Sequence, residues 1–426
     1  MKQSTAPSKA SFLASYLIIA ILVVLPFYTL LSVWASSNFG HLNALRVFKE
    51  LLLLPLGAYA AILVVKNKPL LQRWAGSWLV RLILAYGLFT MAYGLTLVAR
   101  HSVATPAVLQ GLILNLRFLW LFMVVWAVSY ANPLIRNQWA KIVLIPASLA
   151  VSFGLLQRLV LPMDFLKHFG YGPSTIDAVE TVDQKLGYQR IQSGLRGANP
   201  FGAYLVVVLT AAVAYVKRHA YLWLLIAAGL LALFFTYSRS AWIGVVVSLA
   251  CYGWLTVSNR RARRQMLVIA TVLVLLFGMA TWVLRNNDLV QNSLFHADET
   301  SQAVSSNSQR ANALNQGLRE VAQEPLGRGP GTAGPASVRN NGQVRIAENY
   351  FLQIGQELGW LGLSLFVAIN ALVAWELWRR TTTLAKVLLA TLVGITVVNL
   401  ISHAWADDAL SLLWWGLAGA AIMNKE

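Results

Sequence analysis

Residues 12–34 read FLASYLIIAILVVLPFYTLLSVW and contain no charged side chain. A helix crosses the hydrocarbon core of a bilayer with about 20 apolar residues, so this run predicts a membrane-spanning helix. The run exceeds the apolar core of a signal peptide and lacks a small-residue cleavage site. Lys2 and Lys9 precede it. We therefore expect a retained signal anchor whose N-terminus lies in the cytoplasm.

The composition of the whole chain agrees with this interpretation. Its 426 residues are 58% hydrophobic and only 12% charged, which is too apolar for an ordinary soluble domain. We predict an all-α, polytopic membrane protein with about twelve transmembrane helices. The apolar segments that carry this prediction are 12–34, 47–65, 77–98, 107–130, 139–160, 200–216, 219–236, 240–257, 265–285, 359–378, 384–402 and 408–423.

The topology follows from lysine and arginine in the short connections, because cytoplasmic loops retain positive charge. The basic connections are KNKPLLQR (66–73), NPLIRNQWAK (132–141), KRH (217–219), NRRARR (259–264) and RRTTTLAK (379–386). They predict that both termini are cytoplasmic. This topology puts 17 of the 34 basic residues but only two of the 16 acidic residues inside. The formal charge of +18 is therefore a topology signal, and no nucleic-acid partner is expected.

We divide the chain into five parts on this basis. They are transmembrane helices 1–5 (1–160), a first outer loop (161–199), helices 6–9 (200–285), a large outer loop with a helix (286–358) and helices 10–12 (359–426). The two outer loops are the only sizeable mass outside the membrane. An active site is therefore expected where they meet the outer leaflet.

The sequence indicates no metal or nucleotide cofactor. The single cysteine, Cys251, lies in an apolar run and excludes a cysteine-based metal site. No histidine and carboxylate cluster has the spacing of metal ligands. There is also no phosphate-binding P-loop and no dinucleotide fingerprint.

Several arginines gather at the predicted outer face. In RIQSGLRGANPFGAYLVVVL, residues 190–209, Arg190 and Arg196 precede the sixth span, and Asn199 begins it. Arg239, in TYSRSAWIG, lies in a short outer connection between spans seven and eight. Guanidinium groups suit bidentate recognition of phosphate, and a helix N-terminus adds to an anion site. The alternative is that these arginines only extend to lipid headgroups.

A carboxylate precedes the tenth span in RIAENYFLQIGQELGWLG, residues 345–362. Glu348 and Asn349 begin a predicted helix that dips toward the membrane. Glu348 could be the helix N-cap, a salt-bridge partner of an arginine, or a general base for a hydroxyl group.

Other charged residues are further candidates. Arg117 lies about ten residues into the fourth span, a depth at which a charge marks a functional site or a buried pair. Arg310 and Arg328 belong to the second outer loop. His403 is a candidate base near the outer face. The remaining candidates, Arg46, Lys49, Glu50, Asp407 and Asp408, lie at the outer ends of spans and carry weaker predictions.

Four motifs together resemble the O-antigen ligase/polymerase family of bacterial envelope glycosyltransferases. In order along the chain, they are RIQSGLRGANPFGAYL (190–205), YSRSAWIG (237–244), EPLGRGPGTAG (324–334) and ENYFLQIGQELGWLG (348–362). The resemblance implies a glycosyltransferase C-type architecture in the bacterial inner membrane, with a periplasmic active site. It implies an undecaprenyl-pyrophosphate glycan donor and a glycan or lipid-core acceptor. It further implies a chain-length regulator protein as a partner, and no metal.

The resemblance also assigns roles to residues. Arg196 and Arg239 would hold the pyrophosphate, and Glu348 would occupy the catalytic position before Asn349. The predicted catalytic residues are thus Glu348, Arg196 and Arg239, and the predicted substrate-binding residues are Arg190, Asn199, Asn349, Arg117, Arg328 and Arg310. Ligases that complete lipopolysaccharide usually have histidine at the position of Glu348. This departure favours a polymerase, or a ligase with another acceptor.

Elementary chemistry supports the same prediction. Arginines can stabilise a pyrophosphate leaving group without Mg²⁺, and Glu348 can accept a proton from the acceptor hydroxyl in an inverting transfer. The alternative function is a transporter or flippase of an anionic solute or lipid. Such proteins place charges near the midplane of the membrane and often contain inverted repeats, whereas the candidate charges here gather at one face. A non-catalytic scaffold of an envelope complex is a third alternative.

Overall fold

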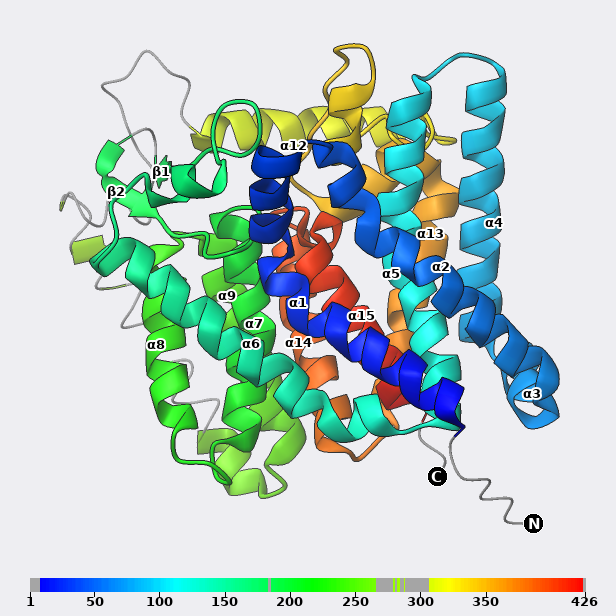
Figure 1. The fold of residues 1–426 in the computed structure, drawn as a ribbon, viewed down its shortest axis with the longest axis horizontal. Coiled ribbons are helices and arrows are strands. Elements are labelled where there is room, and N and C mark those ends of the chain that lie inside the picture. The colour runs from blue at the N-terminus through cyan, green and yellow to red at the C-terminus, as the bar shows by residue number, and fades with distance from the viewer. Residues whose placement is uncertain are drawn as a thin grey trace.

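The computed structural model describes residues 8–182, 185–265, 279, 282–283, 287 and 306–423. The helices are α1 (Lys9–Phe39), α2 (Leu42–Lys66), α3 (Lys68–Gly76), α4 (Trp78–Ala99), α5 (Thr105–Ala131), α6 (Leu134–Leu159), α7 (Ala198–Tyr215), α8 (Leu222–Phe235), α9 (Arg239–Thr256), α12 (Ser306–Gln323), α13 (Tyr350–Trp378), α14 (Thr383–Asn399) and α15 (Asp408–Ile422). Most of them run between the upper and lower ends of the molecule, α1, α2 and α6 obliquely, whereas α12 lies across the upper end (Figure 1).

Seven of the described helices are long and apolar enough to cross a membrane, namely α1, α2, α4, α5, α6, α7 and α13. Three shorter apolar helices, α8, α14 and α15, pack among them. The prediction of a polytopic, mostly helical membrane protein is therefore confirmed, although the count of twelve spans is not established. Most of the predicted span at 265–285 lies outside the described residues.

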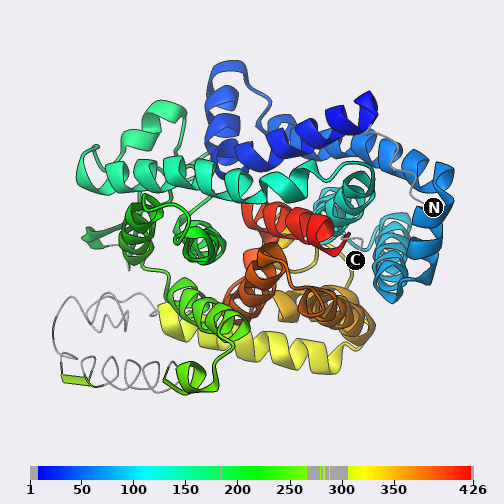
Figure 2. The same cartoon turned by 90° about the horizontal axis from the view of Figure 1, so that it is seen from below.

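Helix α15 forms the centre of the bundle. It packs against α1, α5, α6, α7, α13 and α14, and it lies in the middle when the bundle is viewed along its axis (Figure 2). Every residue from Ala409 to Ile422 is buried. A helix that is apolar all round is stable only inside such a packed environment.

Aromatic side chains fill the core around α15. The ring centroids of Trp414 and Trp415 lie 5.3 Å apart, and Phe118 of α5 lies 5.3 Å from Trp415. The Trp414 indole donates a hydrogen bond of 2.9 Å to the Thr391 hydroxyl, which satisfies its polar atom in the apolar core. These contacts fix the position of the loop that precedes α15, and that loop reaches the candidate site.

Helix α13 is bent at Gly359, where φ is 64°. A Cβ atom at this position would lie 2.1 Å from the carbonyl oxygen of Pro325, so the bend requires glycine. The buried carboxylate of Glu357 accepts hydrogen bonds from the Gly331 amide and from Asn115 of α5. The glycine-rich stretch 324–334 is thereby held between α5 and α13. The helix predicted ahead of the tenth span is the first part of α13.

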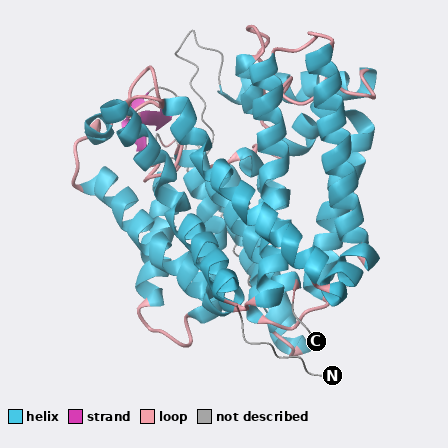
Figure 3. Cartoon of the chain, turned by 45° about the vertical axis from the view of Figure 1, so that its right-hand side comes forward, coloured by secondary structure: helices cyan, strands magenta, loops and turns pink. Residues whose placement is uncertain are grey.

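The segments predicted to be outer loops lie together at one end of the bundle, opposite the end where α1 starts and α15 finishes (Figure 1). Between α6 and α7 the chain forms a short 3₁₀ helix, η1 (Phe165–Phe169), and an antiparallel hairpin of β1 (Glu180–Val182) and β2 (Lys185–Arg190). This hairpin is the only strand pair in the described part of the chain (Figure 3). No pattern in the sequence predicts it. Beyond α12, the short helices η3 (Gly334–Arg339) and η4 (Ala404–Ala406) complete this end.

Candidate functional site

Two cavities open at this loop-bearing end, where α7, α9, α13 and α15 begin. The free amide groups at helix N-termini carry partial positive charge, which favours anions. Gly202 of α7 brings two of these N-termini together, because a Cβ atom there would lie 2.8 Å from that of Ala241 and 3.0 Å from that of Ser238. The N-termini of these helices therefore concentrate partial positive charge at this end of the bundle.

The smaller cavity, of about 310 Å³, brings together five of the nine predicted site residues. They come from β2, α7, α9, α12 and the residue before Asn349, and they are Arg190, Asn199, Arg239, Arg310 and Glu348. Tyr237, Ser240 and Ser402 add hydroxyl groups to its wall. The cavity thus combines a carboxylate, several guanidiniums and neutral hydrogen-bonding groups.

Glu348 has an unusual backbone conformation in this cavity. Its φ is 49°, a left-handed value that costs a non-glycine residue about 1–2 kcal/mol. Its carboxylate lies 2.5 Å from Nε of Arg310, and its side chain is 36% exposed. Residues held in such strained conformations concentrate at functional sites. The salt-bridge alternative for Glu348 is observed, and the carboxylate remains accessible from the cavity.

Asn349, and not Glu348, caps the N-terminus of α13. Its Oδ1 accepts a hydrogen bond of 2.9 Å from the Leu352 amide. Its Nδ2 donates a hydrogen bond of 3.0 Å to the Leu400 carbonyl at the end of α14. Both ends of the Asn349 amide are therefore engaged in fixing where Glu348 lies.

Arg239 is the first residue of α9 and follows a strained turn. Tyr237, two residues earlier, has φ of 50°. The Ser238 and Ser240 hydroxyls lie 3.4 Å apart on either side of Arg239 in sequence. The tight turn points the start of α9 toward the smaller cavity, whose wall includes Arg239.

Arg190 is engaged with protein groups on three sides. It forms an ion pair of 2.7 Å with Glu180, and its Nε donates to the Thr236 carbonyl at 2.8 Å. Its Nη2 donates to Oδ1 of Asn199 at 2.6 Å. Glu180 also accepts a hydrogen bond from the Ala198 amide. Arg190 therefore joins the hairpin to the start of α7 and the end of α8. Its hydrogen bond also occupies Asn199 Oδ1 as an acceptor.

The larger cavity, of about 750 Å³, contains Arg196 together with Arg46 and Arg339. Arg196 is exposed and has no hydrogen bond or ion pair within the described ranges. Arg46 donates only to the Thr175 carbonyl at 3.5 Å, and Arg339 donates to Asn43 at 3.0 Å. Arg196 and Arg339 are close enough to Arg46 for their positive charges to repel its guanidinium. Three guanidiniums without a carboxylate partner in the described structure thus face one cavity.

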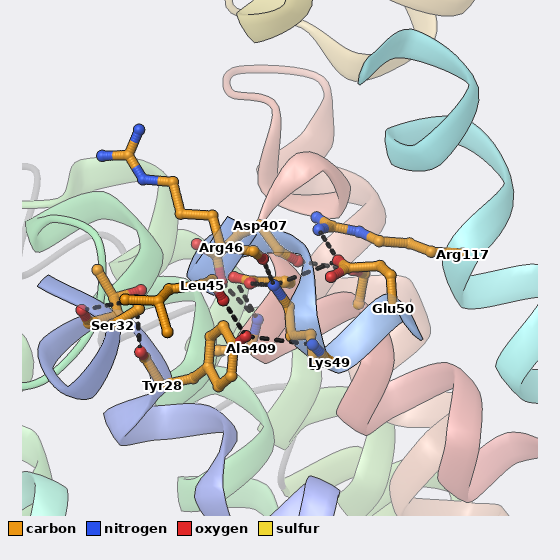
Figure 4. A network of polar contacts seen from close by, with 12 residues as sticks. Tyr28, Ser32, Leu45, Arg46, Lys49, Glu50, Arg117, Asp407 and Ala409 are labelled. Atoms are coloured by element: carbon orange, nitrogen blue, oxygen red, sulfur yellow. Dashed lines mark hydrogen bonds and ion pairs between the residues drawn. The ribbon is translucent and has the colours of Figure 1, made fainter. Parts of the chain in front are cut away.

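Arg117 also lines the larger cavity but belongs to a buried ion-pair network (Figure 4). It lies 3.0 Å from Glu50 and donates to the Ala406 carbonyl at 2.7 Å. Lys49 lies 3.2 Å from Glu50 and 2.7 Å from Asp408. Charges are retained inside a protein only when they are paired. The sequence allowed two alternatives for Arg117, a functional site or a buried ion pair. The structure contains the buried ion pair.

Arg328 lies apart from both cavities. It pairs with Glu324, four residues earlier, and its side chain is 46% exposed. Its backbone amide donates to the Gln356 carbonyl, which holds the glycine-rich stretch on α13. Of the nine predicted residues, Arg328 and Asn349 line neither of the two cavities.

His403 connects the two groups of arginines. Burial lowers its pKa below the ordinary value, Glu348 opposes this shift, and Arg196 and Arg310 add to it. Its Nδ1 is buried without a hydrogen-bond partner in the part of the chain that the structure describes. An uncharged imidazole therefore lies within electrostatic reach of residues from both cavities.

The sequence contains little signal for two of these cations. Arg46 was a weak candidate at the start of the second span, and Arg339 was not a candidate. Arg339 lies in the polar segment SVRNNG, which has no motif that distinguishes it from other loops. Only the packing of η3 against α5 brings it to the cavity.

Residues 220–367 match the family model described as O-antigen ligase. The matched segment includes Arg239, Arg310 and Glu348, and it ends within α13. No curated protein sequence matches the chain.

Proposed function

Since the match over residues 220–367 supports assignment to the O-antigen ligase/polymerase family, we propose that this membrane protein is a glycosyltransferase acting on a lipid-linked glycan. The donor is an oligosaccharide on undecaprenyl pyrophosphate. The acceptor is a hydroxyl group of a glycan or of another molecule at the periplasmic face of the inner membrane. The reaction extends a polysaccharide or ligates it to the acceptor.

One observation carries this proposal. Glu348 shares a cavity of about 310 Å³ with Arg239 and Arg310, at the end of the membrane bundle where several helix N-termini meet. A carboxylate beside guanidiniums combines a proton acceptor with groups that stabilise negative charge. Both are needed for glycosyl transfer from a pyrophosphate.

The chemical step follows from these groups. The acceptor oxygen attacks the anomeric carbon, and its proton passes to the Glu348 carboxylate. The bond between the anomeric carbon and the phosphate oxygen breaks, and undecaprenyl pyrophosphate leaves with the bonding electron pair. Attack from the face opposite the leaving group inverts the anomeric configuration. Guanidiniums placed before the reaction stabilise the charge that develops on the leaving phosphate.

The two cavities suit the two substrates. The larger one has cationic groups at Arg46, Arg196 and Arg339, and apolar side chains at Leu109 and Ile113. This combination fits a diphosphate attached to a hydrocarbon tail. The smaller cavity contains Glu348 and fits the acceptor hydroxyl. In this proposal the diphosphate lies near His403, between the two cavities. Arg196 contacts it from the larger cavity and Arg239 from the smaller one.

Arg190 and Asn349 have supporting roles in this account. Arg190 holds the start of α7 through Glu180 and Asn199, and Asn349 fixes the start of α13. They keep Arg196 and Glu348 in place without touching the substrate. Preorganised positions of this kind lower the cost of reorganisation in the transition state.

The experiment uses purified protein in lipid nanodiscs with undecaprenyl-pyrophosphate oligosaccharide as both donor and acceptor. We expect elongated glycan and released undecaprenyl pyrophosphate in equal amounts, detected by mass spectrometry. Glu348→Gln and Arg239→Ala should each lower the rate of product formation by about 10²-fold or more. Lys167→Ala, an exposed outer-loop cation paired with the exposed Asp164, is the matched control and should retain it.

Two results would contradict the proposal. Full activity in Arg239→Ala would remove the proposed leaving-group stabilisation. Donor binding without covalent product, tested with several hydroxyl acceptors and accompanied by movement of the lipid between leaflets, would favour the transporter or flippase alternative.

A further inference from the structure

A third cavity, of about 480 Å³, lies at the opposite end of the bundle from the candidate site. It is open on one side and is lined by the junction of α3 and α4 and by the last turns of α13 and α15. This is the end that faces the viewer in Figure 2 and on which α1 starts and α15 finishes. The charge distribution predicts that it is the cytoplasmic end. No step of the proposed glycosyl transfer involves it.

Cations predominate in the lining of this cavity. Arg73, Arg379 and Arg380 face one carboxylate, Glu376, which lies 3.5 Å from Arg380. Arg73 and Arg379 are exposed and have no ion-pair partner within residues 8–182, 185–265 and 306–423. The cavity therefore has an excess of positive charge that the described structure does not neutralise.

Tryptophans form the other part of the wall. Trp78 and Trp375 are exposed, whereas Trp126 is only 6% exposed. The Trp126 Nε1 atom is buried and has no hydrogen-bond acceptor in the described structure. Buried donors are nearly always paired, and an acceptor on a bound molecule would satisfy this indole. Tryptophan is also enriched at the interface between lipid tails and headgroups.

The location fits the headgroup layer of a bilayer. Helix α3 has nine residues, too few to span the membrane, and it joins two candidate spans. Its Leu70 is buried and its Arg73 is exposed. A short helix with one buried apolar face and one cationic face is typical of a membrane surface. Basic cavities between transmembrane helices at such a depth accept phosphate-bearing headgroups.

We propose that this cavity binds the headgroup of an anionic phospholipid from the leaflet around it. The phosphate lies between Arg73 and Arg379, and a headgroup oxygen accepts the hydrogen bond of the Trp126 indole. The acyl chains lie against the exposed faces of Trp78 and Trp375. The bound lipid thereby links α3 and α4 to the ends of α13 and α15.

Native mass spectrometry of the detergent-purified full chain tests this inference. The protein is titrated with dioleoyl phosphatidylglycerol and, separately, with dioleoyl phosphatidylcholine. We expect preferential retention of phosphatidylglycerol. The double variant Arg73→Gln/Arg379→Gln should weaken that retention about tenfold or more, because two charge-assisted hydrogen bonds are lost. The double variant Lys217→Gln/Arg218→Gln, in the turn between α7 and α8, is the matched control and should bind as the parent does.

Trp126→Phe provides a second variant that keeps the ring but removes the indole donor. It should weaken phosphatidylglycerol binding by a few-fold while leaving the melting temperature in lipid-free detergent close to that of the parent. Equal binding of the two lipids would overturn the proposal, as would unchanged phosphatidylglycerol binding in Arg73→Gln/Arg379→Gln. Competition by millimolar glycerol phosphate equal to that by the lipid would also overturn it, since the ligand would then be a free phosphate ester.

Discussion

Nε of Arg310, on α12, lies 2.5 Å from the carboxylate of Glu348, the residue before the N-cap of α13. This ion pair joins the helix that crosses the loop-bearing end of the bundle to the start of a membrane helix (Figure 1). Both partners are about one third exposed. Water therefore screens the pair. The free-energy cost is small when the Glu348 carboxylate leaves Arg310 and accepts a hydrogen bond from a substrate hydroxyl instead.

The first prediction concerns Glu348 as the general base. Glu348→Gln removes the proton acceptor but keeps the size of the side chain. We expect kcat to fall by about 10²–10⁴-fold with little change in donor binding. Glu348→His should retain more activity than Glu348→Gln, because imidazole also accepts a proton. Equal activities of the Gln variant and the parent would exclude this role.

The second prediction separates charge from geometry at Arg239. Arg239→Ala should lower kcat by about 10²–10³-fold, the loss typical for one donor that stabilises a developing negative charge. Arg239→Lys keeps the charge but loses the bidentate fork, so partial activity is expected. The measurement is steady-state release of undecaprenyl pyrophosphate. An Arg239→Lys variant no better than Arg239→Ala would argue that the geometry of the fork dominates.

The third prediction concerns Arg190, which the structure ties to Glu180 and Asn199. Arg190→Gln leaves the half-buried Glu180 without its cation, so the melting temperature should fall. The double variant Arg190→Gln/Glu180→Gln should recover part of that loss, because neither partner then carries an unpaired charge. Differential scanning fluorimetry in nanodiscs measures both effects. A direct phosphate contact predicts the opposite pattern, with lost donor affinity, unchanged melting temperature and no rescue.

The fourth prediction concerns pH and His403. Its pKa is lowered in the folded protein, mainly by burial, so the unfolded chain binds more protons than the folded one as the pH falls. Stability rises with pH wherever the unfolded state binds more protons. The contribution of neutral His403 is therefore complete above the ordinary histidine value of about 6.5 and is lost as the pH falls below it. His403→Gln should reduce the drop in melting temperature between pH 7.5 and pH 5. A drop of the same size in this variant would show that His403 does not titrate in this way.

The apolar sequence predicted much of the fold because a chain segment of this kind inside the hydrocarbon of a bilayer must form a helix. Inside a bilayer the amide groups must be satisfied within the helix, so an apolar run such as residues 12–34 becomes a helix, observed as Lys9–Phe39. The start of α7 was predicted equally well, because Pro200 belongs in the first turn of a helix. Local chemistry decides these elements.

The hairpin of β1 and β2 could not be predicted on the same grounds. Its strands have three and six residues with little apolar alternation, and they are held by contacts with other elements. Glu180 pairs with Arg190 across the hairpin, and the hydrogen bonds from the Ala198 amide to Glu180 and from Arg190 to Asn199 anchor the hairpin to α7. The two hydrogen bonds to α7 exist only once the hairpin has packed on that helix. The sequence therefore predicted Arg190 as a substrate ligand and missed its structural partner.

Only those residues of the candidate site that lie in local sequence motifs could be predicted. Motifs mark Arg239 and Glu348, because each lies next to a helix start with a recognisable sequence. The trio of Arg46, Arg196 and Arg339 comes from α2, the α6–α7 loop and η3. Nothing in the local sequence of Arg339 indicates that it faces the other two. Clusters drawn from such distant segments require the tertiary structure.

The most direct test of the account is a ligand-bound map of the protein in nanodiscs with undecaprenyl-pyrophosphate oligosaccharide, using Glu348→Gln to prevent turnover. We expect diphosphate density contacting both Arg196 and Arg239, with the first sugar next to residue 348 and the hydrocarbon tail leaving past Leu109. Diphosphate density that contacts neither arginine, or that lies near the middle of the membrane between the helices, would contradict it.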